Sequence, residues 1–468
     1  MDRQNSMVKK GRKPTPLEAS LAMILIIVVI LCCIKIQLVL ETALVLGAVT
    51  AAIFAFYLGY DWDDIEKGIL DGISHGLTPC IILIVVGMVV GAWILGGTIQ
   101  TLVYYGLKIL TPKVFLPAAF LLCSLTSILI GTSFGTIATM GIVLMGVSEG
   151  LGVPAALTAG AIASGAILGD KVSPLSDSTN LTAAMTGTKL FDHVRSMLYV
   201  TIPAAFISLG LYWVVGNRYI SGEINMETVN SILQTLSSNF NLSPLTLVPP
   251  LLVVLLSIRK VPAVMALMIS FLTASFFAIL TQGATISSIL AVSSGGYVAN
   301  TGLEIVDKLL THGGINSMMN TVAIIMAGTA MGGILENCGV LDTILEALLH
   351  YIKTPRSLIL STLVSGYLML IACGEMMTSI IIPGRTFAPA YKEMNISTSV
   401  LSRTLETAVT LGCIALPWGV AAVYLQKVLN VGFEYIPYTF ISFVSPIIAI
   451  IYAFLGFAMW PYNKKAKQ

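Results

Sequence analysis

The stretch from Ser164 to Asn180 reads SGAILGDKVSPLSDSTN, and it decides how this part of the chain must fold. Its first half continues an apolar helix, whereas its second half gathers charges, hydroxyls and an amide around Pro174. Proline lacks an N–H and clashes with the preceding turn, so a helix breaks at this point and leaves backbone carbonyls without partners. The sequence therefore predicts a helix that is interrupted inside a hydrophobic region.

The composition places this break in a lipid environment. Charged residues make up only 10% of the 468 residues, whereas a soluble protein carries roughly 25%. Hydrophobic residues make up 56%, and the mean hydropathy is +0.91. A net charge of +2 offers no basic field for nucleic acid. The sequence also contains no HExxH zinc motif and no GxxxxGK[ST] motif of a primary pump.

We expect an all-α polytopic membrane protein with roughly 10 to 13 crossings, since a span needs about 20 apolar residues. The stretch 61–74 has the spacing of an interfacial helix, and 216–243 is predicted to be a loop between two halves. The candidate spans are 17–34, 38–58, 77–103, 114–131, 153–169, 197–216, 244–258, 262–281, 317–335, 357–373, 399–416 and 438–460.

Basic residues lie at both ends of the chain. They precede the first apolar run, as in Lys9 and Lys10, and follow the last, as in Lys464 and Lys465. By the positive-inside bias, both termini are predicted to be cytoplasmic, which requires an even number of crossings. No small-x-small cleavage site follows 21–34, so we expect a retained helix rather than a signal peptide. The seven cysteines lie in or beside apolar runs and predict no disulfide framework.

The two halves of the chain are related. When the sequence is aligned with itself so that Thr111-Pro112 falls on Thr354-Pro355, Gly131 falls on Gly374 and Pro174 on Pro417. Glycine and proline mark where helices bend, so both halves are predicted to break at matching places. Matching interruptions in two halves indicate a transporter binding site, with re-entrant hairpins as a further expectation.

We therefore divide the chain into six parts. They are a basic tail 1–16, N-terminal helices with the interfacial helix 17–76, a first repeat half 77–190, linking helices and loop 191–316, a second repeat half 317–425, and a final helix with a basic tail 426–468.

Three charges lie at the break around Pro174. Freed carbonyls, hydroxyls and carboxylates are the ligands of a small hard cation such as Na⁺, and a charge at bilayer depth is costly and therefore rarely idle. The alternative is a polar loop at the membrane surface. The predicted Na⁺/H⁺ ligands here are Asp177 first, Asp170 second because Lys171 is adjacent to it, and Ser176, Ser178, Thr179 and Asn180.

A second stretch, Ile130 to Thr136, is uncharged and rich in hydroxyls. It could be a re-entrant tip at which Ser133 and Thr136 supply oxygens to the same ion. It could equally be a helix-packing face built on Gly131 and Gly135.

The second half carries charges near its own breaks. Glu375 and Arg385 flank a Pro-Gly pair and could form an ion pair, or Arg385 could bind a substrate carboxylate bidentately. Arg403 and Glu406 are three residues apart and could pair on one helix face, or Glu406 could bind an ion or proton. With Lys171, these four are predicted charge-balancing or substrate residues. The four histidines are interpreted as loop or interface residues.

The stretch from Gly169 to Ser178, preceded by TSFGT at 132–136, resembles the NhaC family of bacterial Na⁺/H⁺ antiporters over nearly the whole chain. The resemblance implies sodium–proton exchange in the inner membrane of bacteria, on inverted repeats with hairpins and broken helices. Within that family the chain is most similar to malate–lactate antiporters, which implies proton-coupled malate uptake against Na⁺-lactate efflux.

The expected function is thus secondary antiport of Na⁺ and H⁺ across the lipid bilayer. One carboxylate would bind Na⁺ or H⁺ but not both. A plain Na⁺/H⁺ antiporter without malate or lactate is the alternative, and a cation channel and an intramembrane enzyme are rivals from other classes. We expect no cofactor, no metal other than Na⁺ and no nucleic acid. The sequence leaves open whether the chain forms a homo-oligomer.

Overall fold

The computed structural model describes residues 11–36, 38–109, 111–174, 176–219, 226–259 and 261–462. The basic residues Lys9, Lys10, Lys464 and Lys465 lie outside this part of the chain, as does the segment 220–225. The described residues are almost entirely helical and contain only two isolated β-bridges. The all-α fold class is therefore confirmed.

The first eleven helices run from the N-terminal end to the middle of the chain. They are α1 Pro16–Lys35, α2 Leu40–Tyr57, α3 Trp62–Leu95, α4 Thr98–Ile109, α5 Pro112–Ile130, α6 Ser133–Thr136, α7 Ile142–Leu151, α8 Ala155–Val172, α9 Asp177–Thr186, α10 Leu190–Tyr219 and α11 Met226–Asn239. A π-helical turn, Ile137–Gly141, joins α6 to α7.

The remaining helices complete the chain. They are α12 Val248–Ile258, α13 Ala263–Gln282, α14 Ile286–Gly295, α15 Glu304–Leu310, α16 Met319–Asn337, α17 Val340–His350, α18 Pro355–Cys373, α19 Met376–Glu393, α20 Thr398–Leu405, α21 Val420–Leu429 and α22 Phe440–Leu455. A second π-helical turn, Glu406–Thr410, extends α20.

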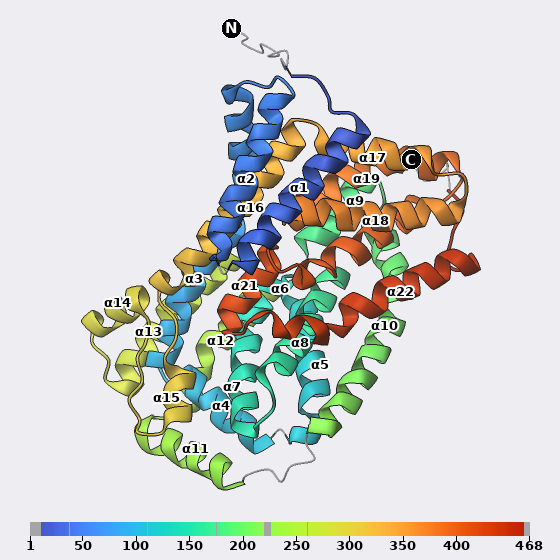
Figure 1. Ribbon diagram of the computed structural model, residues 1–468. Coiled ribbons are helices and arrows are strands. Elements are labelled where there is room, and N and C mark those ends of the chain that lie inside the picture. Colours follow the sequence, from blue (N-terminus) through green and yellow to red (C-terminus); the bar gives the residue numbers. More distant parts are fainter. Residues whose placement is uncertain are drawn as a thin grey trace.

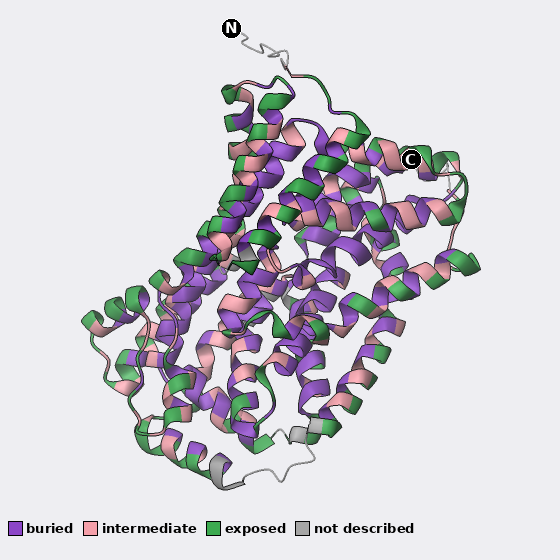
Figure 2. Ribbon diagram, in the orientation of Figure 1, coloured by how far each residue is buried: buried purple, intermediate pink, exposed green. Residues whose placement is uncertain are grey.

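Eight helices in the described part of the chain are long and apolar enough to cross a membrane, and nine if a bent pair counts as one span. That pair, Thr398–Ala415 with Val420–Leu429, bends by 42° around Pro417. Four shorter apolar helices are the further candidates, so the total of 10 to 13 crossings stays a prediction. Large apolar side chains are exposed along the outer helices, as at Phe206 and Leu272, which suits contact with lipid (Figure 2).

Three details of the sequence-based helix assignment are wrong. The expected interfacial helix is not separate, because α3 continues from Trp62 through Pro79 to Leu95 as one helix of 34 residues. The expected span 77–103 is instead divided at Gly96-Gly97, where Gly97 has a φ of +78°. The polar stretch after α10, predicted to be a loop, contains helix α11.

The two halves repeat element by element. When Thr111 is aligned with Thr354, four helices of the first half begin at the positions where four helices of the second half begin. The pairs are α5 and α18, α6 and α19, α8 and α20, and α9 and α21. Helices α5 and α18 also end in the same way, at a glycine with left-handed backbone: Gly131 with φ +75° after α5 and Gly374 with φ +64° after α18. Each half thus contains a helical hairpin, α5 with α6–α7 and α18 with α19, followed by a broken helix.

The hairpins and breaks meet in the middle of the molecule. Helices α5, α7 and α8 fill the lower part of the view and α17, α18 and α19 the upper right, while α6 lies between them (Figure 1). Helix α8 lies unusually close to α5, since a Cβ at Gly165 or Gly169 would meet the backbone of Phe120 or Ser124. This close approach brings the end of α8 against the tip of the first hairpin.

Candidate functional site

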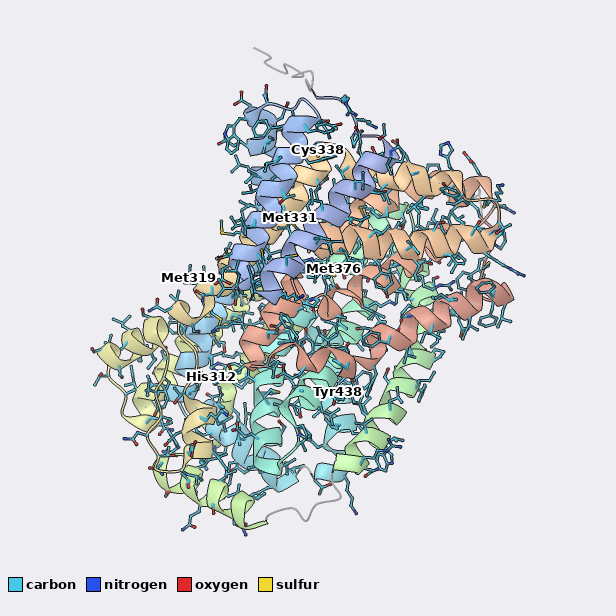
Figure 3. All side chains as sticks on the ribbon, in the orientation of Figure 1. His312, Met319, Met331, Cys338, Met376 and Tyr438 are labelled. Carbon is cyan, nitrogen blue, oxygen red and sulfur yellow. The ribbon has the colours of Figure 1, made fainter. Side chains whose placement is uncertain are left out.

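A central cavity of about 170 Å³ lies where both hairpin tips and both helix breaks converge. Gly131 to Phe134 and Gly374 to Met377 line it from the two tips, and Asp170, Ser176 and Asp177 line it from the first break. Helix α3 closes another side. Met376, at the tip of the second hairpin, lies near the middle of the molecule in Figure 3. Elements of both halves therefore meet at one cavity.

Asp170 is the best-coordinated carboxylate of the cavity. Its side chain is only 4% exposed. Oδ2 accepts hydrogen bonds from Ser133 Oγ at 2.7 Å and from Ser133 N at 3.1 Å. Oδ1 accepts one from Ser176 Oγ at 2.6 Å, and Ser176 Oγ lies 3.1 Å from Ser178 Oγ. One carboxylate and three serine hydroxyls thus lie together, and such oxygens are the ligands that hard cations prefer.

The other polar residues at the break stabilise its backbone. Thr179 Oγ1 donates to the carbonyl of Lys171 at 2.9 Å, and Asn180 Nδ2 donates to that of Pro174 at 2.9 Å. These are carbonyls that the break deprives of helical partners. Thr179 and Asn180, predicted as ion ligands, therefore cap the interrupted helix instead of facing Asp170.

Two further predicted ligands lie apart from the Asp170 carboxylate. Asp177, expected to be the principal carboxylate, is exposed at the start of α9, although it also lines the cavity. Asp170 is thus the buried carboxylate at this break and Asp177 the exposed one. Thr136 is buried, but its hydroxyl donates to the carbonyl of Thr132 within its own helix at 3.0 Å.

The second half presents a different face to the same cavity. Its equivalents of Ser133, Asp170 and Asp177 in the repeat are Met376, Cys413 and Val420, and all three line the cavity. The repeat therefore preserves the backbone path but replaces the oxygen-bearing side chains with apolar or sulfur-bearing ones. At these three positions only the first half offers hard-cation ligands.

Glu375 caps the second hairpin. Its carboxylate accepts hydrogen bonds from Met377 N at 2.7 Å and Thr378 N at 2.8 Å, at the N-terminus of α19. Thr378 Oγ1 in turn lies 3.0 Å from His75 Nδ1 of α3. Arg385, the predicted substrate cation, is exposed on α19 and is not part of the cavity lining. The alternative ion pair between Glu375 and Arg385 is not formed.

A second polar cluster joins the two halves away from the cavity. Lys171 is fully buried and its Nζ donates to Thr407 Oγ1 at 3.0 Å. Glu406 is equally buried, and its Oε1 accepts a hydrogen bond from Thr182 Oγ1 at 2.8 Å. The charges of Lys171 and Glu406 attract each other. Lys171 therefore faces the second half instead of holding Asp170.

Two further residues of this region are His193 and Arg403. His193 is buried in α10, with Nδ1 2.7 Å from Ser402 Oγ and Nε2 4.0 Å from Glu406 Oε1. It is not a loop residue. Arg403 does not pair with Glu406; it donates to the carbonyl of Ala458 at 3.2 Å and lies 5.5 Å from the ring centre of Trp460.

The sequence gives little indication that His75 and His193 contact polar residues of the second half. His75 adjoins Gly72 and Gly76, and glycines four residues apart indicate a close helix contact, here with α16. His193 has no comparable signal, because Ser402 and Glu406, its partners, belong to the other half of the chain.

A membrane protein with a buried carboxylate at the meeting point of two repeated, broken-helix halves has the architecture of a secondary transporter. The model of the Na⁺/H⁺ antiporter family matches residues 16–179 and 165–457. The chain belongs to the Na⁺/H⁺ antiporter family. It is therefore a multi-pass membrane transporter and not an enzyme.

Three relatives illustrate the range of this family. The chain is 37% identical over 415 residues to the Na⁺/H⁺ antiporter NhaC of Alkalihalophilus pseudofirmus, covering 88% of this chain and 89% of the relative. It is 35% identical to the malate-2H⁺/Na⁺-lactate antiporter of Bacillus subtilis, covering 98% of each. It is also 35% identical to the arginine/ornithine antiporter ArcD of Halobacterium salinarum, covering 88% of this chain and 86% of the relative.

Proposed function

We propose that the antiporter exchanges Na⁺ and H⁺ at Asp170. The observation that carries this proposal is the set of oxygens on both sides of one buried carboxylate, from Ser133, Ser176 and Ser178. Each serine hydroxyl can rotate, so it can donate to the bare carboxylate or turn its lone pairs to a bound cation.

Exchange follows from the competition of two cations for one negative charge. Na⁺ bound by the Asp170 oxygens leaves no site for a proton, and a proton on Oδ1 or Oδ2 removes the charge that holds Na⁺. Asp177 at the edge of the same cavity adds a second negative charge near the path of the arriving cation.

The Lys171–Glu406 cluster has a separate proposed role. Removing two buried charges from water is costly unless they compensate each other. Because Lys171 belongs to α8 and Glu406 to the extension of α20, their attraction ties the broken helices of the two halves together. We assign this pair to charge balance within the scaffold, with the Asp170 site as the exchanging group.

Access to Asp170 is proposed to run along α3. On one side of the central cavity, a narrow cavity of about 10 Å³ borders His75, Glu336 and Glu375. On the other side, a cavity of about 720 Å³ borders Val90 and Ile94. The three cavities therefore follow one another along this helix, as an alternating-access path requires.

Coupling to malate and lactate is the finer proposal. It is supported by the name and the 98% coverage of the Bacillus subtilis relative. The arginine/ornithine antiporter is equally similar in sequence, although the substrates in its name are cationic amino acids. A plain Na⁺/H⁺ antiporter is the alternative. We further propose a bacterial inner-membrane location with cytoplasmic termini, and transport halves at 77–190 and 317–425.

The test is transport in proteoliposomes that contain a pH-sensitive dye. A Na⁺ pulse should move protons in vesicles with the unmodified protein, and Asp170→Asn should abolish that signal while the protein still incorporates. K⁺ replaces Na⁺ as the cation control, and malate or lactate is then added on either side. Sodium flux that persists without any counter-ion gradient would identify a channel, and unchanged exchange by Asp170→Asn would remove Asp170 from the site.

A further inference from the structure

The largest cavity described above is not part of the Asp170 site. Its volume is about 720 Å³, and we call it the vestibule. Helices α3, α7 and α21 line it at Val90, Glu149 and Lys427, and the segment before α16 contributes His312. His312 lies to the lower left of Met376 in Figure 3. The vestibule and the central cavity have no lining residue in common.

The vestibule nevertheless extends along the helices that form the central cavity. On α3, Ile82 borders the central cavity and Val90 the vestibule, eight residues apart or about 12 Å along a helix. On α21, Ala421 borders the first and Lys427 the second. The vestibule therefore lies in line with the Asp170 site.

The charge of the vestibule is predominantly positive. Lys308 and Lys427 line it against one carboxylate, Glu149, and His312 adds a hydrogen-bonding imidazole. Glu149 is attracted by Lys308, whereas the charge of Lys427 acts on His312. Within the described residues, neither lysine has a carboxylate oxygen within 4.0 Å. A half-buried lysine without a carboxylate partner, at a cavity of about 720 Å³, is a ready site for an anion.

We propose that the vestibule binds a small organic carboxylate through Lys427, with His312 beside it. The inference rests on the proposed organic-anion coupling. It places the anion beside Lys427, which lies in the last turn of α21. The Nζ of Lys427 supplies the full charge, and polar groups such as Tyr297 and Ser148 supply hydrogen bonds around it. The volume far exceeds that of a four-carbon acid, so the anion keeps water around it.

Helix α21 then connects the anion to the cation site. Tyr424 lies one turn before Lys427, and its hydroxyl donates to the carbonyl of Phe134 at 2.8 Å, next to Ser133. At the start of the helix, Val420 N donates to the carbonyl of Gly374 at 2.8 Å. One helix thus contacts both hairpin tips, so an anion bound to Lys427 is connected through α21 to the backbone that positions Ser133 against Asp170.

The test measures binding without transport. Thermal unfolding of the purified full-length protein is followed in detergent with L-malate, L-lactate or L-arginine, for the wild type, K427Q and K427R. Malate or lactate should raise Tm of the wild type. K427Q should weaken that binding at least tenfold, and K427R should restore most of it. Lys353 is exposed and does not line the vestibule, so K353Q is the matched control. This variant should bind malate or lactate as the wild type does.

The outcomes separate this inference from the proposed function. Loss of the malate shift in K427Q with recovery in K427R supports the vestibule site, even if vesicles transport no anion and the coupling proposal fails. Malate transport together with undiminished malate binding by K427Q overturns the vestibule site and leaves the coupling intact. A shift caused by arginine and by neither carboxylate overturns the anion assignment, as does the absence of any shift in the wild type.

Discussion

Ser133 Oγ donates a hydrogen bond of 2.7 Å to Asp170 Oδ2, although the two residues are 37 positions apart. The bond joins the tip of one hairpin to the end of a broken helix. A movement of either element therefore changes the number of oxygens around the carboxylate, which links cation binding to the geometry of the first half.

Removal of the Asp170 charge tests the centre of this arrangement. Asp170→Asn preserves the size of the side chain and one acceptor oxygen but lacks the charge for which Na⁺ and H⁺ compete. We expect no Na⁺-driven proton movement in vesicles, with normal incorporation. Asp177→Asn should reduce the rate only partly, because Asp177 is exposed and lacks the serine partners of Asp170. Equal loss of Na⁺-driven proton movement in both variants would show that Asp177 also belongs to the ion site.

The Ser133 hydroxyl should contribute to cation affinity. A hydrogen bond to a charged group contributes about 1.5 to 3 kcal/mol, so Ser133→Ala should raise the Na⁺ concentration for half-maximal exchange roughly tenfold to a hundredfold. Thr139→Ala is the matched control, because its hydroxyl donates to the backbone carbonyls of Gly135 and Thr136 in the same helical segment and not to Asp170. The measurement is the Na⁺ concentration for half-maximal exchange by each variant in vesicles. Equal increases for Ser133→Ala and Thr139→Ala would show that the loss of affinity comes from altered packing.

The tip of the second hairpin should be sensitive to backbone strain. Gly374 has a φ of +64°, so Gly374→Ala costs about 1 kcal/mol. Gly283→Ala introduces the same strain at φ +65°, in a place where an added Cβ meets nothing within 4 Å. Both variants should lose similar stability in thermal unfolding. Only Gly374→Ala should slow exchange, and similar rates would show that the tip tolerates this change.

The buried pair Lys171 and Glu406 should be coupled in stability. Removing one partner leaves an uncompensated buried charge, so Lys171→Met and Glu406→Gln should each cost about 3 to 5 kcal/mol. The double variant should lose less than the sum of the single ones. Thermal unfolding of all four proteins in one detergent measures the coupling, and strictly additive losses would contradict the proposed pairing.

The vestibule predicts a change at one histidine. Burial first, and the positive charge of Lys427 second, hold the pKa of His312 below its usual range. Lys427→Met removes the second cause and leaves the first, so the pKa of His312 should rise yet stay under the ordinary value of about 6.5. Carbon-13 NMR of the four labelled histidines can follow it. An unchanged pKa would place the two side chains too far apart to share a ligand.

The sequence by itself determined the membrane class, the position of most helices and the repeat that relates the two halves. Hydropathy, glycine and proline act locally, so they can be read without the fold. Thr111-Pro112 and Thr354-Pro355 do begin equivalent helices, and Gly131 and Gly374 do end them.

Only the tertiary structure decided which polar side chains face one another. Asp170 and Lys171 are adjacent in sequence, yet one points to Ser133 in the cavity and the other to Thr407 in the opposite half. Successive helical residues lie about 100° apart, so neighbours in sequence meet different surroundings. Thr182 and His193, the partners of Glu406, are remote from it along the chain and become its neighbours only when the two halves pack together.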